Sequence, residues 1–143
     1  MNKWLITFGL LLSLSGFAAP IADIQDLGSL AGDEDAVCAI YVYRKGCPYC
    51  RALESEVLQP MAAGGEFEQF CMGRLNWEGG ELIDFDGTAI SSQAIVARYG
   101  VVVVPTIVFV DAAGRQLTDS LVGYQGSELY FALLRKRYRQ AAL

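Results

Sequence analysis

Two cysteines separated by two residues, Cys47 and Cys50, are the residues of this chain best suited to do chemistry. They stand in the stretch RKGCPYCR, which runs from residue 44 to residue 51. At the start of a helix the sulfur atoms of such a pair can reach each other across the first turn. Pro48 fits there because the first helical N–H groups have no intrahelical partner. The pattern predicts a reversible dithiol–disulfide centre.

The two sulfurs are expected to differ in reactivity. At a helix N-terminus, unpaired N–H groups and the helix dipole favour the Cys47 thiolate over the thiol. The nearby cations Arg44, Lys45 and Arg51 act in the same direction. Because the thiolate is the nucleophile in disulfide exchange, Cys47 is the predicted attacking cysteine. Cys50, one turn further in and more shielded, is the predicted resolving cysteine.

The pair has three other possible interpretations: an inert structural disulfide, half of a zinc site, and chance. A zinc site needs two more ligands, but the chain has no histidine. The remaining cysteines, Cys38 and Cys71, do not form a second pair with the same spacing. Structural bridges usually close a longer loop than this one. The redox interpretation is therefore favoured.

The elements around the motif form a strand, a helix and a second strand. The uncharged, β-branched and aromatic run Val37–Tyr43 predicts a buried strand. Apolar residues at helical spacing follow the motif, and Phe70–Trp77 predicts the next strand. A strand, helix and strand in this order imply a right-handed crossover and parallel pairing. The residues that carry the helical pattern are Leu53, Val57, Leu58 and Met61.

Outside this unit the apolar pattern predicts three further elements. Ile21, Ile24, Leu27 and Leu30 step by three and indicate a short amphipathic helix. Residues 78–88 are polar and Gly-rich, as expected of a loop. Ser91 or Ser92 can cap a helix with Ile95, Val96 and Tyr99 on one face, ended by Gly100.

The last third of the chain predicts a hairpin and a closing helix. Proline cannot donate to a sheet, so the apolar strand is expected to begin just after Pro105. Residues 111–114 form the turn, and Gln116–Val122 is the return strand. Gly126 and Ser127 open the final helix. Its predicted apolar face consists of Leu129, Tyr130, Leu133 and Leu134.

The amino terminus has the layout of a secretory signal peptide. Lys3 is followed by the apolar run Trp4–Leu14 and then by small residues. Cleavage after Ala18 is expected, with Ala22 as a second candidate site, so residues 1–18 are the signal and 19–143 the domain. The alternative is an uncleaved membrane anchor. In either case the domain lies outside the cytoplasm, which in a Gram-negative cell means the periplasm, where disulfides are permitted.

Length and charge limit the remaining possibilities. The 143 residues suffice for one domain with a core but not for two. With 11 basic and 16 acidic residues the net charge is −5, which argues against nucleic acid as a partner. The basic cluster near the C-terminus is interpreted as the solvated last turn of a helix, where cations complement the dipole. It comprises Arg135, Lys136, Arg137 and Arg139.

From Val37 to Leu134 the chain resembles the thioredoxin family. The shared features are Cys-Pro-Tyr-Cys after the first strand and the segment Val104-Pro105-Thr106 before the third. The resemblance implies an α/β thioredoxin-like fold, with a central mixed four-stranded sheet built from a β-α-β unit and a C-terminal β-hairpin, flanked by helices. It implies a cis Pro105 lying against the cysteines, and a Val104 backbone that pairs with an extended substrate chain.

Beside the catalytic pair, the resemblance implies five substrate-binding residues: Pro48, Tyr49, Val104, Pro105 and Thr106. The nearest subgroup is that of the bacterial periplasmic thioredoxins of the sulfur-oxidation-associated (SoxW) kind.

The chain departs from its relatives at two points. The Pro-Tyr dipeptide is that of glutaredoxins, but their glutathione-binding glycines and aspartate have no match near residues 121–124, so a glutathione site is not expected. In thioredoxins a buried acid lies beneath the cysteines, and here Tyr41 occupies that position. Another group or water must then accept the proton of Cys50.

Cys38 and Cys71 form the second cysteine pair. They fall near the starts of the two strands expected to pair in parallel, where their Cα atoms could come within bridging range. Strand neighbours often point to opposite faces, however, and buried free thiols pack well as small hydrophobes. Both a structural disulfide and two free thiols remain open.

The predicted function is thiol–disulfide exchange with other exported proteins and with a redox donor or acceptor whose identity the sequence leaves open. Reductase activity is slightly favoured over oxidase activity. No cofactor is expected, membrane contact is expected only if the signal is uncleaved, and a monomer is expected. Two alternatives are a thioredoxin-like carrier of copper(I) or another metal, and a non-catalytic binding module. Carriers of this fold normally add a histidine, and this chain has none.

Overall fold

A computed structural model describes residues 21–68 and 70–143 of the protein. The expected signal peptide, residues 1–18, lies outside these ranges. Within them no helix is both long and apolar enough to cross a membrane. The elements are β1 (Cys38–Tyr43), α1 (Pro48–Leu53), the π-helical segment η1 (Glu54–Leu58), α2 (Gln59–Ala63), the 3-10 turn η2 (Glu66–Glu68), β2 (Cys71–Asn76), β3 (Glu81–Ile83), β4 (Ala89–Ser91), α3 (Ser92–Arg98), β5 (Thr106–Val110), β6 (Leu121–Val122) and α4 (Ser127–Ala141).

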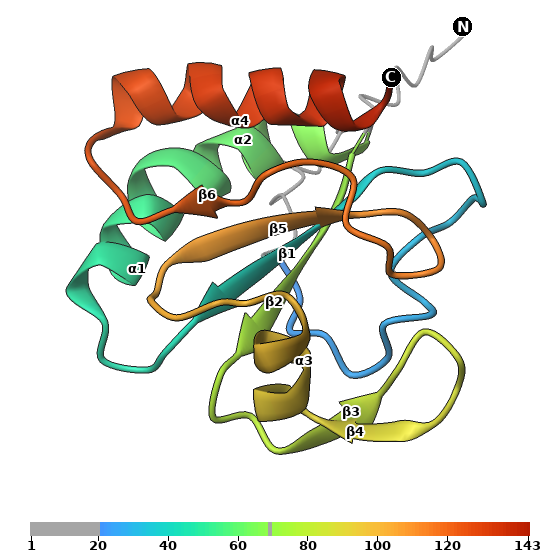
Figure 1. The fold of residues 1–143 in the computed structure, drawn as a ribbon. Helices are drawn as coiled ribbons and strands as arrows, with labels where there is room; N and C mark the ends of the chain where they lie inside the picture. The colour runs from blue at the N-terminus through green and yellow to red at the C-terminus, as the bar shows by residue number, and fades with distance from the viewer. Residues whose placement is uncertain (1–20, 69) are drawn as a thin grey trace, which may run out of the picture.

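The central sheet has four strands in the order β2-β1-β5-β6 (Figure 1). Strands β1 and β2 are parallel, whereas β5 runs antiparallel to both β1 and β6. This mixed sheet, with its β-α-β unit and C-terminal hairpin, confirms the predicted fold class. Strand β5 begins at Thr106, directly after Pro105, as the proline predicted.

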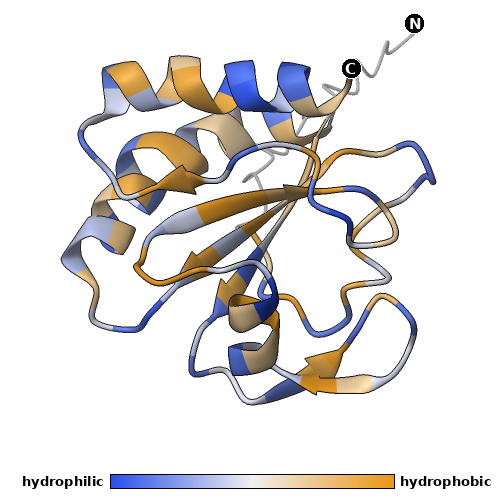
Figure 2. Ribbon diagram, viewed as in Figure 1, coloured by the Kyte–Doolittle hydropathy of each residue, from blue (hydrophilic) through white to orange (hydrophobic). Residues whose placement is uncertain are grey.

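Each face of the sheet is covered, so the molecule has two hydrophobic cores. Strand β1 is buried along its whole length, and its successive side chains alternate between the two faces. Ala39, Tyr41 and Tyr43 join a core with α1, η1 and α4. Cys38, Ile40 and Val42 join the other, with α3 (Figures 1 and 2). The unbroken apolar run in β1 therefore reflects a strand with no face in water.

The helix that carries the motif runs without a break through α1, η1 and α2. Within η1 the Gln59 N–H donates to the Glu54 carbonyl, five residues back. Pro60 accounts for this widening, because it has no N–H and its ring crowds the carbonyl of Glu56 four residues earlier. Insertion of a π-turn is a common way for a helix to absorb such a defect, and it often marks a functional site.

The predicted N-terminal helix is wrong. Residues 21–27 instead form an extended strap that bridges β2 from Asp23 to Arg74 and β3 from Asp26 to Ile83, and a turn follows at residues 28–30. Gly73 permits this close approach, since a Cβ there would lie 2.4 Å from Ile24 and 2.9 Å from Leu30. The apolar residues of this segment are divided between the two cores: Ile24, Leu27 and Leu30 pack on the α3 face of the sheet, and Ile21 packs on the opposite face.

Three smaller expectations are corrected. The polar segment 78–88 is not entirely loop, because Glu81–Ile83 pairs with Ala89–Ser91 as a short hairpin. The return strand is shorter than predicted, since it comprises only Leu121–Val122, with one isolated bridge from Gln116 to Val110. Leu129 is 57% exposed, and the buried face of α4 is Tyr130, Leu134 and Tyr138. The α3 helix agrees with expectation, since the Ser91 hydroxyl accepts from the Ala94 N–H.

Candidate active site

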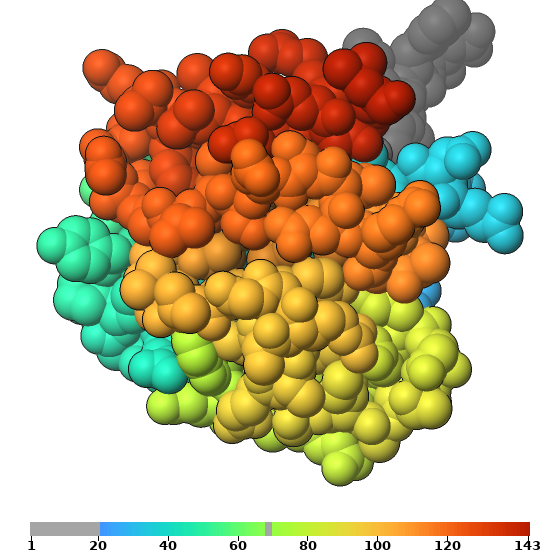
Figure 3. Space-filling view, in the orientation of Figure 1, coloured from blue at the N-terminus to red at the C-terminus, as the bar shows by residue number. Residues whose placement is uncertain are grey.

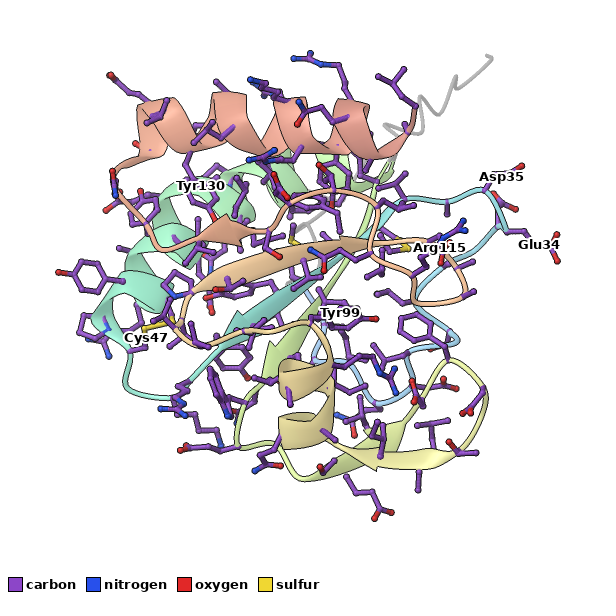
Figure 4. The ribbon with its side chains drawn as sticks, in the orientation of Figure 1. Glu34, Asp35, Cys47, Tyr99, Arg115 and Tyr130 are labelled. Carbon is purple, nitrogen blue, oxygen red and sulfur yellow. A yellow bond between two sulfur atoms is a disulfide. The ribbon has the colours of Figure 1, made fainter. Side chains whose placement is uncertain are left out.

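The cysteine motif lies where β1 leaves the sheet and α1 begins (Figure 4). Gly46 has φ of 79°, a left-handed conformation that suits glycine and turns the chain back toward the helix. Cys47 is the N-cap of α1, and Pro48 occupies its first turn. The strand-to-helix position predicted from the sequence is therefore the one observed.

The two sulfurs are joined in a disulfide, with Cα atoms 5.3 Å apart. Cys47 is half-buried, whereas Cys50 is only 2% exposed. The Cys50 N–H donates to the Cys47 sulfur over 3.1 Å. In the reduced protein this same bond would stabilise a Cys47 thiolate, because a charged acceptor gains more than a neutral one from a backbone donor.

The neighbouring cations stabilise the Cys47 thiolate less than the sequence suggested. The Arg44 guanidinium lies over the Trp77 ring, 4.2 Å from its centroid, which holds that charge against the end of β2. Lys45 and Arg51 are exposed to solvent, where water and salt screen their charges. The helix terminus is therefore the main local feature that favours the thiolate.

The expected substrate-binding loop lies beside the motif (Figures 3 and 4). The Val104–Pro105 peptide bond is cis, and Cys47 and Val104 pack against the same core. Among the described residues, none forms a hydrogen bond with the backbone of Val104. Thr106 is buried, and its hydroxyl donates to the Val103 carbonyl over 2.8 Å, which fixes the loop.

The surface around this loop is apolar and exposed. The exposed fraction is 65% for Tyr49, 81% for Val102 and 47% for Val103. An unpaired backbone next to exposed valines is a surface on which an extended chain can form hydrogen bonds and bury apolar side chains.

Beneath Cys50 lies Tyr41, as the sequence indicated, and beside it Glu54, which the sequence analysis did not single out. The Tyr41 hydroxyl lies 3.2 Å from the Cys50 carbonyl and 3.1 Å from the Glu54 carboxylate, so its single proton is shared between these two acceptors. Burial, reinforced by Glu54, holds the pKa of Tyr41 well above its usual range, so the hydroxyl remains a donor. The spacing of four residues between Cys50 and Glu54 was the available signal, because it places both on one helical face.

The second cysteine pair forms a disulfide, which resolves the alternative left open by the sequence. Cys38 and Cys71 are register partners in β1 and β2, with Cα atoms 4.6 Å apart. Cys38 belongs to the core on the α3 face, whereas Cys50 belongs to the opposite core. The bridge also lies at the start of β1, roughly 17 Å along the strand from the end that leads to the motif. It is therefore remote from the motif.

Metal ligands do not cluster in the part of the chain that the structure describes. No group of three or more His, Cys, Asp or Glu side chains there could hold an ion.

Comparison with known proteins agrees with this architecture. The model of the thioredoxin-like domain family matches residues 26–138, which is most of the chain. The protein belongs to the thioredoxin-like family.

A curated relative is the thiol:disulfide interchange protein DsbD of Tatumella citrea, which is 29% identical over 119 residues. The match covers 81% of this chain but 18% of the relative, so the chain spans less than a fifth of that protein.

Two solved structures illustrate the shared fold. Thioredoxin f from spinach chloroplast has a TM-score of 0.62 and 11% identity, with 91% of this chain and 100% of that chain covered. A thioredoxin-fold protein from Helicobacter pylori has a TM-score of 0.56 and 22% identity. The match covers 79% of this chain and 81% of that chain.

The geometry predicts an acidic thiol at Cys47. The pKa of the reduced Cys47 thiol is expected to lie below that of an ordinary free thiol, since the Cys50 N–H and the helix terminus stabilise the thiolate. The measurement is the pH dependence of alkylation by iodoacetamide in Cys50→Ser, which isolates the Cys47 thiol. A pKa at or above the ordinary thiol value would contradict the prediction.

Proposed function

We propose that the protein is a thiol–disulfide oxidoreductase that reduces disulfides in other exported proteins through Cys47 and Cys50. The observation that carries the proposal is the geometry of the motif. A half-buried sulfur caps a helix beside an exposed apolar loop, and its partner is buried directly behind it. A purely structural disulfide gains nothing from this arrangement. The name of the DsbD relative, a thiol:disulfide interchange protein, supports the same chemistry.

In the reductive direction the reaction has two steps. The Cys47 thiolate attacks one sulfur of a substrate disulfide; a bond forms to Cys47, and the other substrate sulfur leaves with the electron pair and takes up a proton. The Cys50 thiol then loses its proton and attacks the Cys47 sulfur. The Cys47–Cys50 disulfide forms, and the second substrate sulfur leaves as a thiolate. The substrate gains two electrons and the protein becomes oxidised, the state present in the structure.

The substrate chain is held in this proposal by the loop before β5. An extended segment pairs with the free backbone of Val104 and lies against Pro105, while Pro48, Tyr49 and the side of the loop near Thr106 frame the sulfur under attack. The partners are thus exported proteins with an accessible disulfide, and an electron donor restores the dithiol after each turnover.

The proposed setting is the periplasm, reached through a signal peptide at residues 1–18. The strap supports cleavage after Ala18 rather than after Ala22. The Ala22 carbonyl accepts from the Arg74 N–H over 2.9 Å, so cleavage there would break up the strap. In this proposal the protein is a reductase of the SoxW kind and acts as a monomer. It contacts the membrane only if the signal is retained.

The test is an insulin-reduction assay with dithiothreitol as electron donor. The protein is expected to accelerate precipitation of the reduced insulin B chain at least tenfold over dithiothreitol alone, whereas Cys47→Ser gives the background rate. An equal rate for the two proteins would refute the proposal. Tight copper(I) binding without reductase activity would instead favour the carrier alternative.

A further inference from the structure

The segment that leads from β6 to α4, residues 122–126, is bonded to the loop that carries the cis proline (Figure 1). Val122 is the register partner of Thr106, the first residue of β5. The Gly123 N–H donates to the Pro105 carbonyl over 2.8 Å. Any shift of this β6–α4 segment is therefore passed on to the Pro105 loop.

On its other side the β6–α4 segment is bonded to the motif helix, which comprises α1, η1 and α2. The Tyr124 hydroxyl donates to the Glu56 carboxylate in η1 over 2.5 Å. A charged acceptor makes this bond stronger than one between neutral groups. Glu56 has a firm base, because its neighbours Val57 and Leu58 are both 0% exposed. Within the described residues, no other hydrogen bond joins residues 122–126 to the motif helix.

The Tyr124 ring is held independently of its hydroxyl. It packs edge to face on the Tyr130 ring of α4, with the ring centroids 5.5 Å apart. Burial, reinforced by the Glu56 carboxylate, raises the pKa of Tyr124 to about 12, so the hydroxyl remains a donor at neutral pH. Removal of the hydroxyl alone therefore breaks the link to the motif helix and leaves the packing of the ring in place.

These bonds connect the two sides of the expected substrate surface. One side is the motif helix with Cys47, and the other is the loop with Pro105. Cys47, Val104 and Tyr124 all pack against the same core. The separation between the helix and the loop is thus held by packing and by one path of hydrogen bonds, which runs through Glu56, Tyr124 and the backbone of the β6–α4 segment.

We propose that the Tyr124–Glu56 hydrogen bond is a brace that fixes the Pro105 loop at the separation from the motif helix that an extended protein chain needs in order to bind at Cys47. The inference rests on the proposed function. Tyr124 and Glu56 are positioning residues, because they act through the loop and not on the reacting sulfurs. Without the brace this separation varies, and a bound chain must restore it at a cost in binding free energy.

The brace should affect protein substrates and small disulfides differently. A protein chain has to meet the backbone of Val104 and the sulfur of Cys47 at the same time, so its binding depends on the distance between them. Ellman's reagent, a small disulfide, needs only the Cys47 thiolate. Its reaction therefore reports the reactivity of the sulfur, whereas reduction of insulin reports that reactivity together with binding of the chain.

The experiment compares two rates. One is kcat/KM for insulin with dithiothreitol as electron donor, and the other is the second-order rate constant of the reduced protein with Ellman's reagent. In Tyr124→Phe, kcat/KM for insulin is expected to fall about tenfold, because the lost bond has a charged acceptor. The rate with Ellman's reagent should be unchanged. Glu56→Ala should have the same effects, and Glu56→Gln, which keeps an acceptor oxygen, should recover part of the loss.

A double variant tests that the two side chains act through one bond. Tyr124→Phe combined with Glu56→Ala should be no slower with insulin than either single variant, since each alone already breaks the brace. The matched control is Tyr99→Phe. It removes a tyrosine hydroxyl that donates to the Gly114 carbonyl over 2.7 Å, from a ring that packs on the α3 face of the sheet. This control is expected to keep both wild-type rates.

The possible failures are distinguishable. If the wild-type protein does not reduce insulin faster than Cys47→Ser, the proposed function fails. If it does, and Tyr124→Phe keeps the wild-type ratio of the two rates, the brace is overturned. Equal slowing with insulin and Ellman's reagent, or losses that multiply in the double variant, overturns it as well. Urea unfolding of the oxidised proteins checks that the variants are folded, and Glu56→Ala carries the test if Tyr124→Phe is not.

Discussion

Exported proteins are expected to accumulate as mixed disulfides on the Cys50→Ser variant and not on Cys47→Ser. The half-buried Cys47 is the sulfur that a substrate disulfide can reach, whereas Cys50 is 2% exposed and lies behind it. Removal of Cys50 leaves the first attack intact and blocks resolution. Removal of Cys47 abolishes the first attack, so the expected difference between the variants is close to all or none.

The measurement is expression of each variant with its N-terminal leader, acid quenching, alkylation and non-reducing electrophoresis. Adducts on Cys50→Ser should disappear when the sample is reduced. The double variant Cys47→Ser, Cys50→Ser controls for capture through Cys38 or Cys71. Equal trapping by the two single variants, or trapping by Cys47→Ser alone, would show that the nucleophile has been assigned wrongly.

Loss of the Cys38–Cys71 disulfide is expected to have the largest effect on stability. The bridge joins residues 33 apart in sequence. The loop-entropy relation therefore gives a loss of about 4 kcal/mol in the free energy of unfolding. The measurement is urea denaturation of oxidised protein with Cys38→Ala and Cys71→Ala. Alanine is preferred to serine because Cys38 is 1% exposed, and a buried hydroxyl would need a partner.

The matched control removes the other bridge. Cys47→Ala with Cys50→Ala opens a loop that spans only three residues of sequence separation, so the same relation gives a loss of about 2 kcal/mol. The Cys38→Ala, Cys71→Ala variant should retain insulin reduction at a temperature where it is folded, because its bridge lies in the opposite core. Loss of activity in folded protein would mean that this pair takes part in turnover.

The main elements could be predicted because their signals are local. The run Val37–Tyr43 is apolar throughout because β1 has both faces covered, and the motif after it combines a proline and a cysteine pair at a helix start. Pro105 marked the start of β5, because a residue without an N–H cannot pair within the sheet. The sequence alone therefore determined the fold class and the two sulfurs proposed to react.

The errors come from segments whose shape depends on distant partners. Residues 21–30 have the apolar spacing of a helix, but hydrogen bonds to Arg74 in β2 and to Ile83 in β3 hold the strap extended, and Gly73 leaves room for it. The return strand was overestimated because polar residues between Gln116 and Leu121 bond among themselves; the Gln116 side chain donates to the Thr118 carbonyl and the Ser120 hydroxyl.

The tertiary structure alone decided which cysteines pair and which carboxylate lies beneath the motif. Parallel pairing in one register sets Cys38 opposite Cys71 and Tyr41 opposite Arg74. A shift of one residue would turn these side chains to opposite faces of the sheet. Glu54 is four residues from Cys50 in the sequence, but its bonds to Tyr41 and Arg74 join three separate elements. Local sequence determines which side chains a helix or strand presents, whereas contacts between elements exist only after the sheet has assembled.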